Sequence, residues 1–555
     1  MSKVGRIIAC LGLVFALLAE RDAAAQQRLQ RTSPEAQGVS SECVASFLDS
    51  VQRVAGAELH SLVLMRHGAV ISEAYFAPFR AEDAHTLFSV SKTFVAAAVG
   101  LCVEDGLLDV DDRLCDILGN CPKGGIEDVT VEHLLTMTAG ISPSFTLRDT
   151  SEQWVRDYLH RPMASAAGGQ FAYDSMVSYL LSAVVSKVAG CSALELLQRR
   201  LFEPMGIEEA HWEVSPEGIS CGGWGLWLRA ESQAKFGQLL LQRGRWSLGD
   251  GEERQLLSAQ WVDQMMEVRV DTMGYGFQMW RCKNLGTMRA DGLHGQFIIV
   301  MPREDMVCVV NQCITAAAPG HEEMRLLFDN VARKVKDGPL EENRRALRWL
   351  RRMEEACVVK LETEDDGEWE NLGKVGEAME QGADLQISVD SVAKAELRAR
   401  DFTWTGFRLR KRDKSLGLSI EEMGHTERKW TGEWDRQPLA EAVEMECGQG
   451  RWVYTKVPRE VVPHPRGLVR GAYEGLPDSL TVAARYAVRK DGGLRIDLCF
   501  VDWISRLSID IDGETQETAK NGRRENIGEW EVKLRIGLNY RVQGVELRGR
   551  MRLAR

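Results

Sequence analysis

Two kinds of hydrophobic pattern divide the chain. Up to about residue 335, apolar runs with helical spacing lie between short segments rich in strand-forming residues. A strand pair is predicted in residues 58–76, around a turn at His67 and Gly68, and three more strands in residues 274–313. A strand pair, many helices and then more strands predict a sheet closed by both ends of the domain, with a helical lobe between them.

The predicted helices fill most of the sequence between these strands. They are expected after Ser89 as far as about residue 104, and in residues 129–140, 173–190, 192–206 and 228–246. Gly140 is the expected stop of the second helix, since glycine readily adopts the left-handed conformation that ends helices.

Beyond about residue 380 the pattern changes to short alternating strands separated by turns rich in Gly, Asp and Pro. Nine such segments are predicted, in residues 384–390, 402–411, 415–422, 451–457, 480–488, 494–503, 505–511, 530–538 and 545–553. This pattern is typical of a β-rich sandwich- or barrel-like domain. We therefore predict an α+β domain over residues 35–335, a helix and linker over 336–379, and a β-rich domain over 380–555.

The N-terminus has the features of a secretory signal peptide over residues 1–25. Lys3 and Arg6 precede an apolar stretch, residues 7–19, and Ala23–Ala25 offers a small-residue cleavage site. The apolar stretch is too short for a comfortable membrane span, and no later segment is long and apolar enough to cross a bilayer. We expect an exported, periplasmic or secreted protein with no membrane contact beyond the signal segment.

Charge and cysteine content narrow the function classes. The net charge of the 555 residues is −12 and there is no basic tract, so nucleic acid is not an expected partner. Thirteen cysteines include no Cys-x-x-Cys pair, which argues against a zinc ribbon or a thioredoxin-like site. Cys115 and Cys121 are the closest candidates for a disulfide, whereas Cys102, Cys308 and Cys499 are expected as buried free thiols.

A Ser-x-x-Lys sequence, Ser89-Val90-Ser91-Lys92, begins an otherwise apolar helical stretch. One helical turn would place the Lys92 ammonium beside the Ser89 hydroxyl, as a nucleophile and its base require. The alternative is structural, with Ser89 as a helix cap and Lys92 solvated. The motif also begins at Ser232, near the start of an amphipathic helix, and at Ser391, among alternating strands where positions i and i+3 face opposite ways.

Tyr173 is the candidate partner of this serine and lysine. It is the only tyrosine followed two places on by Ser or Asn, here Ser175, and it follows a glycine-rich approach to a helix. A tyrosine held close to Lys92 would have a lowered pKa and could accept the Ser89 proton. The alternative is that Tyr173 packs at the helix start, with Asp174 or Ser175 as the cap.

A glycine-rich strand start supplies the third candidate element. Gly292, His294 and Gly295 precede a strand of strong β-formers, where a substrate could approach the backbone closely. The N–H of Gln296, together with that of Ser89, would then form an oxyanion hole. The alternative is a plain turn with a solvated histidine.

Taken together, residues from about 35 to 330 resemble the serine β-lactamase/penicillin-binding-protein superfamily, in its class C-like β-lactamase-related serine hydrolase branch. The resemblance rests on segments that stand in the family's order, namely VLMRHGAVISEAYFAPF, HTLFSVSKTFVAAAVGLCVEDGLLDVDD, VTVEHLLTMTAGIS, FAYDSMVSYLLSAVV, EPMGIEEAHWE, GGWGLWLRAESQAKFGQLLLQRGRW, YGFQMW and GLHGQFIIVMPREDMVCVV. It implies a β-lactamase/transpeptidase-like domain, with an antiparallel sheet flanked by helices plus an all-helical lobe.

The resemblance also implies roles for individual residues. Ser89 matches the nucleophile, Lys92 its lysine, and Tyr173 and Ser175 the Tyr-x-Asn motif. The Lys-Thr-Gly motif falls on residues 293–295, so that His294 and Gly295, with Ser175, would line the substrate site. Ser175 stands where Asn is commoner. Leu293 replaces the lysine that helps bind a substrate carboxylate. Both departures also occur in branches resembling carboxylesterases and 6-aminohexanoate-dimer hydrolases.

The expected activity is hydrolysis of a small-molecule or peptide ester or amide through an acyl-enzyme on Ser89, without a metal or cofactor. One alternative is a D,D-peptidase or β-lactamase. The other is a catalytically inactive binding protein of the same fold. For the β-rich C-terminal domain, binding of cell-wall or carbohydrate material and packing that shapes the cleft remain open alternatives.

Overall fold

The computed structural model describes most of the chain from residue 28 onwards. The described residues are 28–144, 147, 151–248, 252–282, 286–314, 321–359, 376, 379–380, 384–389, 404–423, 427–428, 434–435, 442–461, 475–511, 529–538 and 545–554. The predicted signal segment, most of the predicted linker and Ser391 lie outside these residues.

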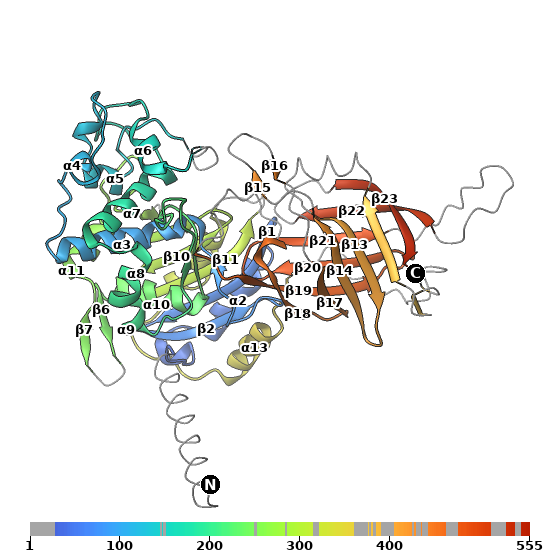
Figure 1. The fold of residues 1–555 in the computed structure, drawn as a ribbon. Coiled ribbons are helices and arrows are strands. Elements are labelled where there is room, and N and C mark those ends of the chain that lie inside the picture. Colours follow the sequence, from blue (N-terminus) through green and yellow to red (C-terminus); the bar gives the residue numbers. More distant parts are fainter. Residues whose placement is uncertain are drawn as a thin grey trace, which may run out of the picture.

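A six-stranded antiparallel sheet is the centre of the first domain (Figure 1). Its order is β2 (Ala69–Tyr75), β1 (Ala57–Arg66), β11 (Met306–Ile314), β10 (Gln296–Met301), β9 (Thr287–Gly292) and β8 (Trp280–Cys282). Strand β1 pairs with β11 over nearly its whole length, so the two ends of the domain meet in the middle of the sheet. The predicted closure of the sheet by both ends of the domain is confirmed.

Both faces of this sheet are covered, because its side chains alternate between two cores. Val63 and Met65 belong to the larger core, whereas their neighbours Leu62 and Leu64 belong to another. The larger core includes helices α3 (Ser91–Glu104), α7 (Ser175–Ala189) and α10 (Ala230–Leu241). The other includes α2 (Ser41–Val51), α12 (Glu322–Asn330) and α13 (Arg344–Glu355).

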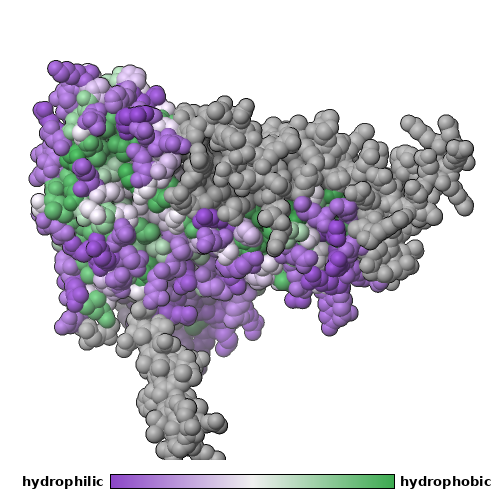
Figure 2. Space-filling model, in the orientation of Figure 1, coloured by the Kyte–Doolittle hydropathy of each residue, from purple (hydrophilic) through white to green (hydrophobic). Residues whose placement is uncertain are grey.

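The helical lobe is inserted between β2 and β8. It contains α4 (Leu114–Leu118), α5 (Val131–Leu135), α6 (Trp154–Leu159), α7 and α11 (Ala259–Met266), beside α8 (Ala193–Leu197) and α9 (Glu203–Met205). Hydrophobic residues gather on the lobe in Figure 2, while the surface below it is mostly hydrophilic. The disulfide Cys115–Cys121 lies in this lobe, and Cys102, Cys308 and Cys499 are buried free thiols, as predicted.

Helix α5 ends at Leu135, five residues before the predicted stop at Gly140. The side-chain amide of Gln278 donates hydrogen bonds to the carbonyls of Leu134 and Leu135, at 3.0 and 2.8 Å. Tertiary partners therefore satisfy the last carbonyls of the helix, and Met137 turns the chain away with a left-handed φ of 59°.

The C-terminal domain is a curled, ten-stranded sheet. Its order is β17 (Val443–Gln449), β14 (Ser415–Met423), β13 (Trp404–Lys411), β12 (Asp384–Val389), β23 (Val545–Ala554), β22 (Glu529–Leu538), β21 (Arg506–Ile511), β20 (Leu494–Phe500), β19 (Ser479–Val488) and β18 (Val453–Pro458). Strand β17 also pairs with β19 in parallel, which joins the two ends of the curl. All nine predicted strands are present; β17 was not predicted.

The two domains pack closely against each other. Arg506 of β21 donates to Glu58 of β1 at 3.1 Å, and the Tyr454 hydroxyl donates to the Pro78 carbonyl at 2.9 Å. The apolar core of the C-terminal sheet also contains Trp227 and Cys313 of the first domain. Figure 1 shows the helical lobe and the C-terminal sheet on opposite sides of the six-stranded sheet.

No single helix among the described residues has the length and hydropathy of a membrane span. Only the bent pair of segments Ser175–Ala189 and Ala193–Met205 meets those criteria jointly, across a bend of 67°. Ten residues of α7 are buried, which is the packing of a core helix.

Candidate active site

Ser89 lies in a tight turn that leads into helix α3. The turn, Phe88–Val90, is a 3-10 segment that follows the short strand β3 (His85–Thr86). Phe88 adopts a left-handed φ of 47°, a conformation that costs a non-glycine residue about 1–3 kcal/mol and is concentrated at functional sites. Neither the turn nor α3 has a side-chain cap, so the alternative in which Ser89 caps the helix is wrong.

Hydrogen bonds tie this turn to strand β5 (Leu226–Leu228). The Ser91 hydroxyl donates to the Phe88 carbonyl at 2.6 Å and accepts from the Leu226 N–H at 3.1 Å. The Leu87 N–H donates to the Leu226 carbonyl at 2.9 Å. Ser91 therefore has a structural role in holding the turn, and Ser89 is the hydroxyl that remains in the site.

Lys92 is buried beside Ser89, and only 1% of its surface is exposed. Its Nζ lies 3.0 Å from Ser89 Oγ, 2.9 Å from Ser175 Oγ and 2.6 Å from the carbonyl oxygen of Gly223. Burial lowers the pKa of Lys92 to about 7, and the charge of Asp174 opposes the shift. The alternative of a solvated lysine is wrong, because Lys92 is buried with its Nζ next to the Ser89 hydroxyl.

Tyr173 flanks the same cluster. Lys92 Nζ lies 4.9 Å from the centre of its ring, and 38% of the tyrosine is exposed. Burial of the phenol raises the pKa of Tyr173, although hydrogen bonds with Ser89 and Trp280 act in the opposite direction. The shift of the Tyr173 pKa is therefore opposite to the predicted lowering, because burial of the phenol outweighs these hydrogen bonds.

The start of helix α7 positions Tyr173 and Ser175 on either side of Asp174. The Asp174 side chain accepts from the Met176 N–H at 2.9 Å, which makes it the helix cap, and from the Tyr158 hydroxyl at 2.6 Å. Asp174 is thus the helix cap that the alternative interpretation predicted, and the roles of Tyr173 and Ser175 in a site stay a prediction. Asp174 satisfies the helix end, while the residues next to it reach Lys92 and Ser89.

Gly223 is a site residue that none of the sequence motifs includes. Its carbonyl accepts the shortest of the three hydrogen bonds from Lys92. A Cβ at this position would collide with the carbonyl oxygen of Ser175, so only glycine lets this loop pass the start of α7 so closely. The glycines of the segment GGWGLW were the signal for such a close approach.

The hairpin between β9 and β10 lies against the turn that carries Ser89. Gly292 has no room for a Cβ beside the carbonyl of Leu87, and the ring of His294 lies 5.7 Å from that of Phe88. His294 adopts a left-handed φ of 62°, and its Nδ1 lies 3.0 Å from the Ile314 carbonyl. The alternative of a fully solvated histidine is therefore wrong.

The side chain of Gln296 fixes the conformation of this hairpin. It donates to the carbonyls of Leu293 and Gln312, at 3.1 and 2.7 Å. Gly295, with φ 88°, completes the turn where a Cβ would meet Gln312. The oxyanion hole from the N–H groups of Ser89 and Gln296 stays a prediction.

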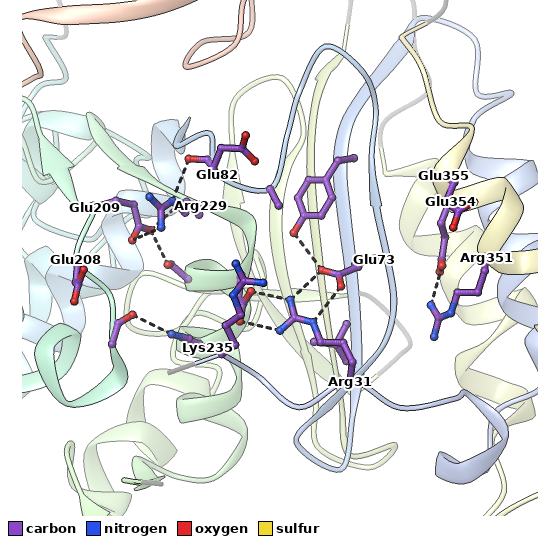
Figure 3. A pocket seen from close by; sticks show the side chains of 17 residues that line it. Arg31, Glu73, Glu82, Glu208, Glu209, Arg229, Lys235, Arg351, Glu354 and Glu355 are labelled. Atoms are coloured by element: carbon purple, nitrogen blue, oxygen red, sulfur yellow. Dashed lines mark hydrogen bonds and ion pairs between the residues drawn. The ribbon is translucent and has the colours of Figure 1, made fainter. Parts of the chain in front are cut away.

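The second Ser-x-x-Lys copy lies elsewhere, in a charged cavity of about 880 Å³ on the side of α10 (Figure 3). The Ser232 hydroxyl donates to Glu209 at 2.6 Å, and Lys235 donates to the carbonyls of Met205 and Gly206 at 2.8 and 3.0 Å. Each of the two side chains has its own partners, so this copy has a structural role.

In the part of the chain that the structure describes, no group of three or more His, Cys, Asp or Glu side chains could hold a metal ion. The chemistry that the cluster supports is proton transfer between a hydroxyl and an amine. A hydroxyl whose proton can pass to a neighbouring amine becomes a nucleophile.

The lowered pKa of Lys92 gives a testable pH dependence. Below about pH 7 the amine is protonated and cannot accept the Ser89 proton, so the reactivity of Ser89 should fall tenfold per pH unit and level off above that pH. The second-order rate constant for labelling by a fluorophosphonate, measured from about pH 5 to 9, tests this. A flat profile, or a midpoint near that of an exposed lysine, would contradict it.

Comparisons with known proteins show which family the chain resembles. A model of the Beta-lactamase family matches residues 43–333. The 6-aminohexanoate-dimer hydrolase of Paenarthrobacter ureafaciens is 24% identical over 321 residues, 52% of this chain and 81% of that protein. Penicillin-binding protein 4 of Amycolatopsis lactamdurans is 32% identical over 133 residues, 22% of this chain and 34% of that protein.

A third relative, the lovastatin esterase of Penicillium rubens, is 25% identical over 165 residues, 24% of this chain and 41% of that protein. The chain thus spans well under half the length of the second and third relatives. The family model, by contrast, spans more than half of the chain and includes the whole cluster around Ser89 and Lys92. This protein belongs to the beta-lactamase family, and its relatives include hydrolases.

Proposed function

We propose that the protein is a serine hydrolase that cleaves an ester or amide bond through an acyl-enzyme on Ser89. The observation that carries the proposal is the buried contact of 3.0 Å between Lys92 Nζ and Ser89 Oγ, at a lysine whose pKa is about 7. A nucleophilic serine needs a base within hydrogen-bond reach, and general bases work best with a pKa near the operating pH.

The three partners of Lys92 determine which of them the N–H groups of the neutral amine bind and which one its lone pair faces. A neutral amine has two N–H groups and one lone pair. The Gly223 carbonyl can only accept, and it takes one N–H at 2.6 Å, while Ser175 Oγ takes the other at 2.9 Å. The lone pair is then left for the proton of the Ser89 hydroxyl. Ser89 Oγ attacks the substrate carbonyl carbon as its proton passes to Lys92.

Tyr173 acts as a proton donor in this mechanism. Its raised pKa keeps the phenol protonated near neutral pH. The phenol lies beside Ser89 and Lys92, where it can donate to the leaving oxygen or nitrogen and recover the proton that Lys92 took from Ser89. Water then attacks the acyl-enzyme, with Lys92 as the base, and Ser89 leaves as the free hydroxyl. The N–H groups of Ser89 and Gln296 would stabilise both oxyanions.

The names of the relatives support an ester or amide substrate. One matched protein is a hydrolase of the 6-aminohexanoate dimer and another is a lovastatin esterase. Leu293, which is 55% exposed at the hairpin beside Phe88, supplies no cation for a substrate carboxylate. A neutral acyl substrate suits this site better than a β-lactam or a peptide with a free carboxylate.

Replacing Leu293 by lysine should shift this preference. Hydrolysis of a carboxylate-bearing β-lactam should rise about tenfold relative to a neutral p-nitrophenyl ester, since a charged hydrogen bond contributes about 1.5–3 kcal/mol. Leu107→Lys is the matched control, because Leu107 is also exposed but follows α3 at the end opposite Ser89. Equal ratios in both variants would contradict the assigned role of Leu293.

A substrate panel tests the proposed function directly. The wild type should hydrolyse short-chain p-nitrophenyl esters or anilides with burst kinetics, and a penicillin should form little stable adduct. A stable penicillin adduct together with slow ester turnover would favour the D,D-peptidase or β-lactamase alternative. No turnover and no adduct with any acyl donor would favour a catalytically inactive binding protein.

A further inference from the structure

Trp503 belongs to the C-terminal domain, yet it lies next to the turn that carries Ser89. It lies between β20 and β21, where its backbone N–H donates to the Phe500 carbonyl at 2.8 Å and only 5% of the residue is exposed. The centre of its ring is 5.7 Å from that of Phe88 and 5.3 Å from that of Trp227. Aromatic rings at such separations attract each other by about 0.5–1.5 kcal/mol beyond their burial.

Phe88 links Trp503 to the nucleophile, because its ring packs on Trp503 and its backbone precedes Ser89. Its backbone has the left-handed φ of 47°, it is bonded directly to Ser89, and its side chain packs against the core of the C-terminal domain. A strained backbone persists only where surrounding contacts enforce it. For Phe88, the C-terminal domain supplies the main aromatic contact on one side and His294 supplies it on the other.

Trp503 also contacts Trp227, which lies on the strand that is hydrogen-bonded to the same turn. Trp227 lies on β5, next to Leu226, whose N–H and carbonyl bond to Ser91 and Leu87 on either side of Ser89. Trp227 also belongs to the apolar core of the C-terminal domain. One tryptophan of the second domain therefore contacts both structures that hold the nucleophile turn.

We propose that Trp503 is a positioning residue of the acylation site, so that the C-terminal domain completes the hydrolase centre. This inference rests on the proposed function of Ser89. Packing of Trp503 on Phe88 keeps the Phe88 backbone in its left-handed conformation. This conformation holds Ser89 Oγ at 3.0 Å from Lys92 Nζ. A displacement of about 1 Å at a reacting group can reduce a rate by about a hundredfold.

The test compares full-length wild type with Trp503→Ala and Trp503→Phe, using a fluorophosphonate under excess reagent. Two quantities are read for each protein: the final labelled fraction, which counts folded sites, and the second-order rate constant. A purely structural role would lower the labelled fraction of Trp503→Ala and leave the rate constant of its folded molecules unchanged. Positioning predicts a nearly complete labelled fraction with a rate constant about tenfold to a hundredfold lower.

Trp503→Phe should recover most of the rate, because a smaller ring can still pack on Phe88. Trp452→Ala is the matched control, since Trp452 is a half-buried tryptophan of the same domain that packs in a different core, under Arg485. Its rate constant should match that of the wild type. If Trp503→Ala reacts within about twofold of the wild type, or if Trp452→Ala is equally slow, the proposal fails while Ser89 keeps its role. A wild type that is not labelled at Ser89 would overturn both.

Discussion

Replacement of Ser89 by alanine is expected to lower turnover of an ester or amide substrate by roughly 10⁴-fold or more, to the residual rate that binding alone can give. The reason is chemical, because alanine offers no atom to which the acyl group could transfer. The change should leave the fold intact, since Ser89 is neither a helix cap nor part of an apolar core. Steady-state kinetics with p-nitrophenyl esters, together with a thermal melt, measures both effects.

Ser232→Ala is the matched control for this variant. Ser232 has the same motif position on α10, but its hydroxyl bonds to Glu209 at 2.6 Å in a separate cavity. Its removal should leave kcat unchanged and cost about 1.5–3 kcal/mol of stability, the usual value of a hydrogen bond to a carboxylate. Full activity in Ser89→Ala, or an equal loss in Ser232→Ala, would refute the assignment of the nucleophile.

Replacement of Lys92 by methionine should lower the rate of Ser89 acylation by about 10²–10⁴-fold, the usual contribution of a general base. Methionine has about the length of lysine and no charge, so it fits the buried position with little change in volume. The pH dependence that Lys92 imposes near pH 7 should disappear with it. Stopped-flow labelling with a fluorophosphonate across the same pH range is the measurement.

Lys235→Met is the control that separates a base from a merely buried lysine. Burial also lowers the pKa of Lys235, but its Nζ donates to the carbonyls of Met205 and Gly206. Leaving these acceptors without a donor should destabilise the fold by about 1–3 kcal/mol each. The rate constant of the folded molecules should not change. A rate loss in Lys235→Met as large as that in Lys92→Met would contradict the proposed base.

Much of the fold follows from local patterns that the sequence shows directly. The apolar run Leu62–Met65 before the turn at His67 and Gly68 predicts β1 without any tertiary information. Gly190, at φ 67°, ends α7 where a helix stop is expected. Such features depend on neighbours in the chain, so a single sequence is sufficient to predict them.

Other elements depend on distant partners and were not predictable. Strand β17 alternates Val443, Met445 and Cys447 with two glutamates, but only Val443 is a strong strand former. Pairing with β14 and β19 stabilises the strand. Helix α5 ends early because Gln278, more than 140 residues away in the chain, bonds its last carbonyls.

In the candidate site, too, local contacts were predictable from the sequence and long-range contacts were not. The spacing of Ser89 and Lys92 on one helical turn predicted their contact, and the motif after Tyr173 brought Ser175 to the same lysine. The raised pKa of Tyr173 could not be predicted, because it depends on how completely the folded protein buries the phenol. The contact of Trp503 with Phe88 joins two domains and has no sequence signature.

Localising a trapped acyl group tests the central claim most directly. The full-length protein is mixed with an activated ester, quenched in acid during the burst, and digested, and the peptide AEDAHTLFSVSK, residues 81–92, is fragmented. We expect one acyl group on Ser89, none on Ser91 of the same peptide, and none in Ser89→Ala. An acyl group on Ser91 or Ser232, or no covalent intermediate during measurable turnover, would contradict it.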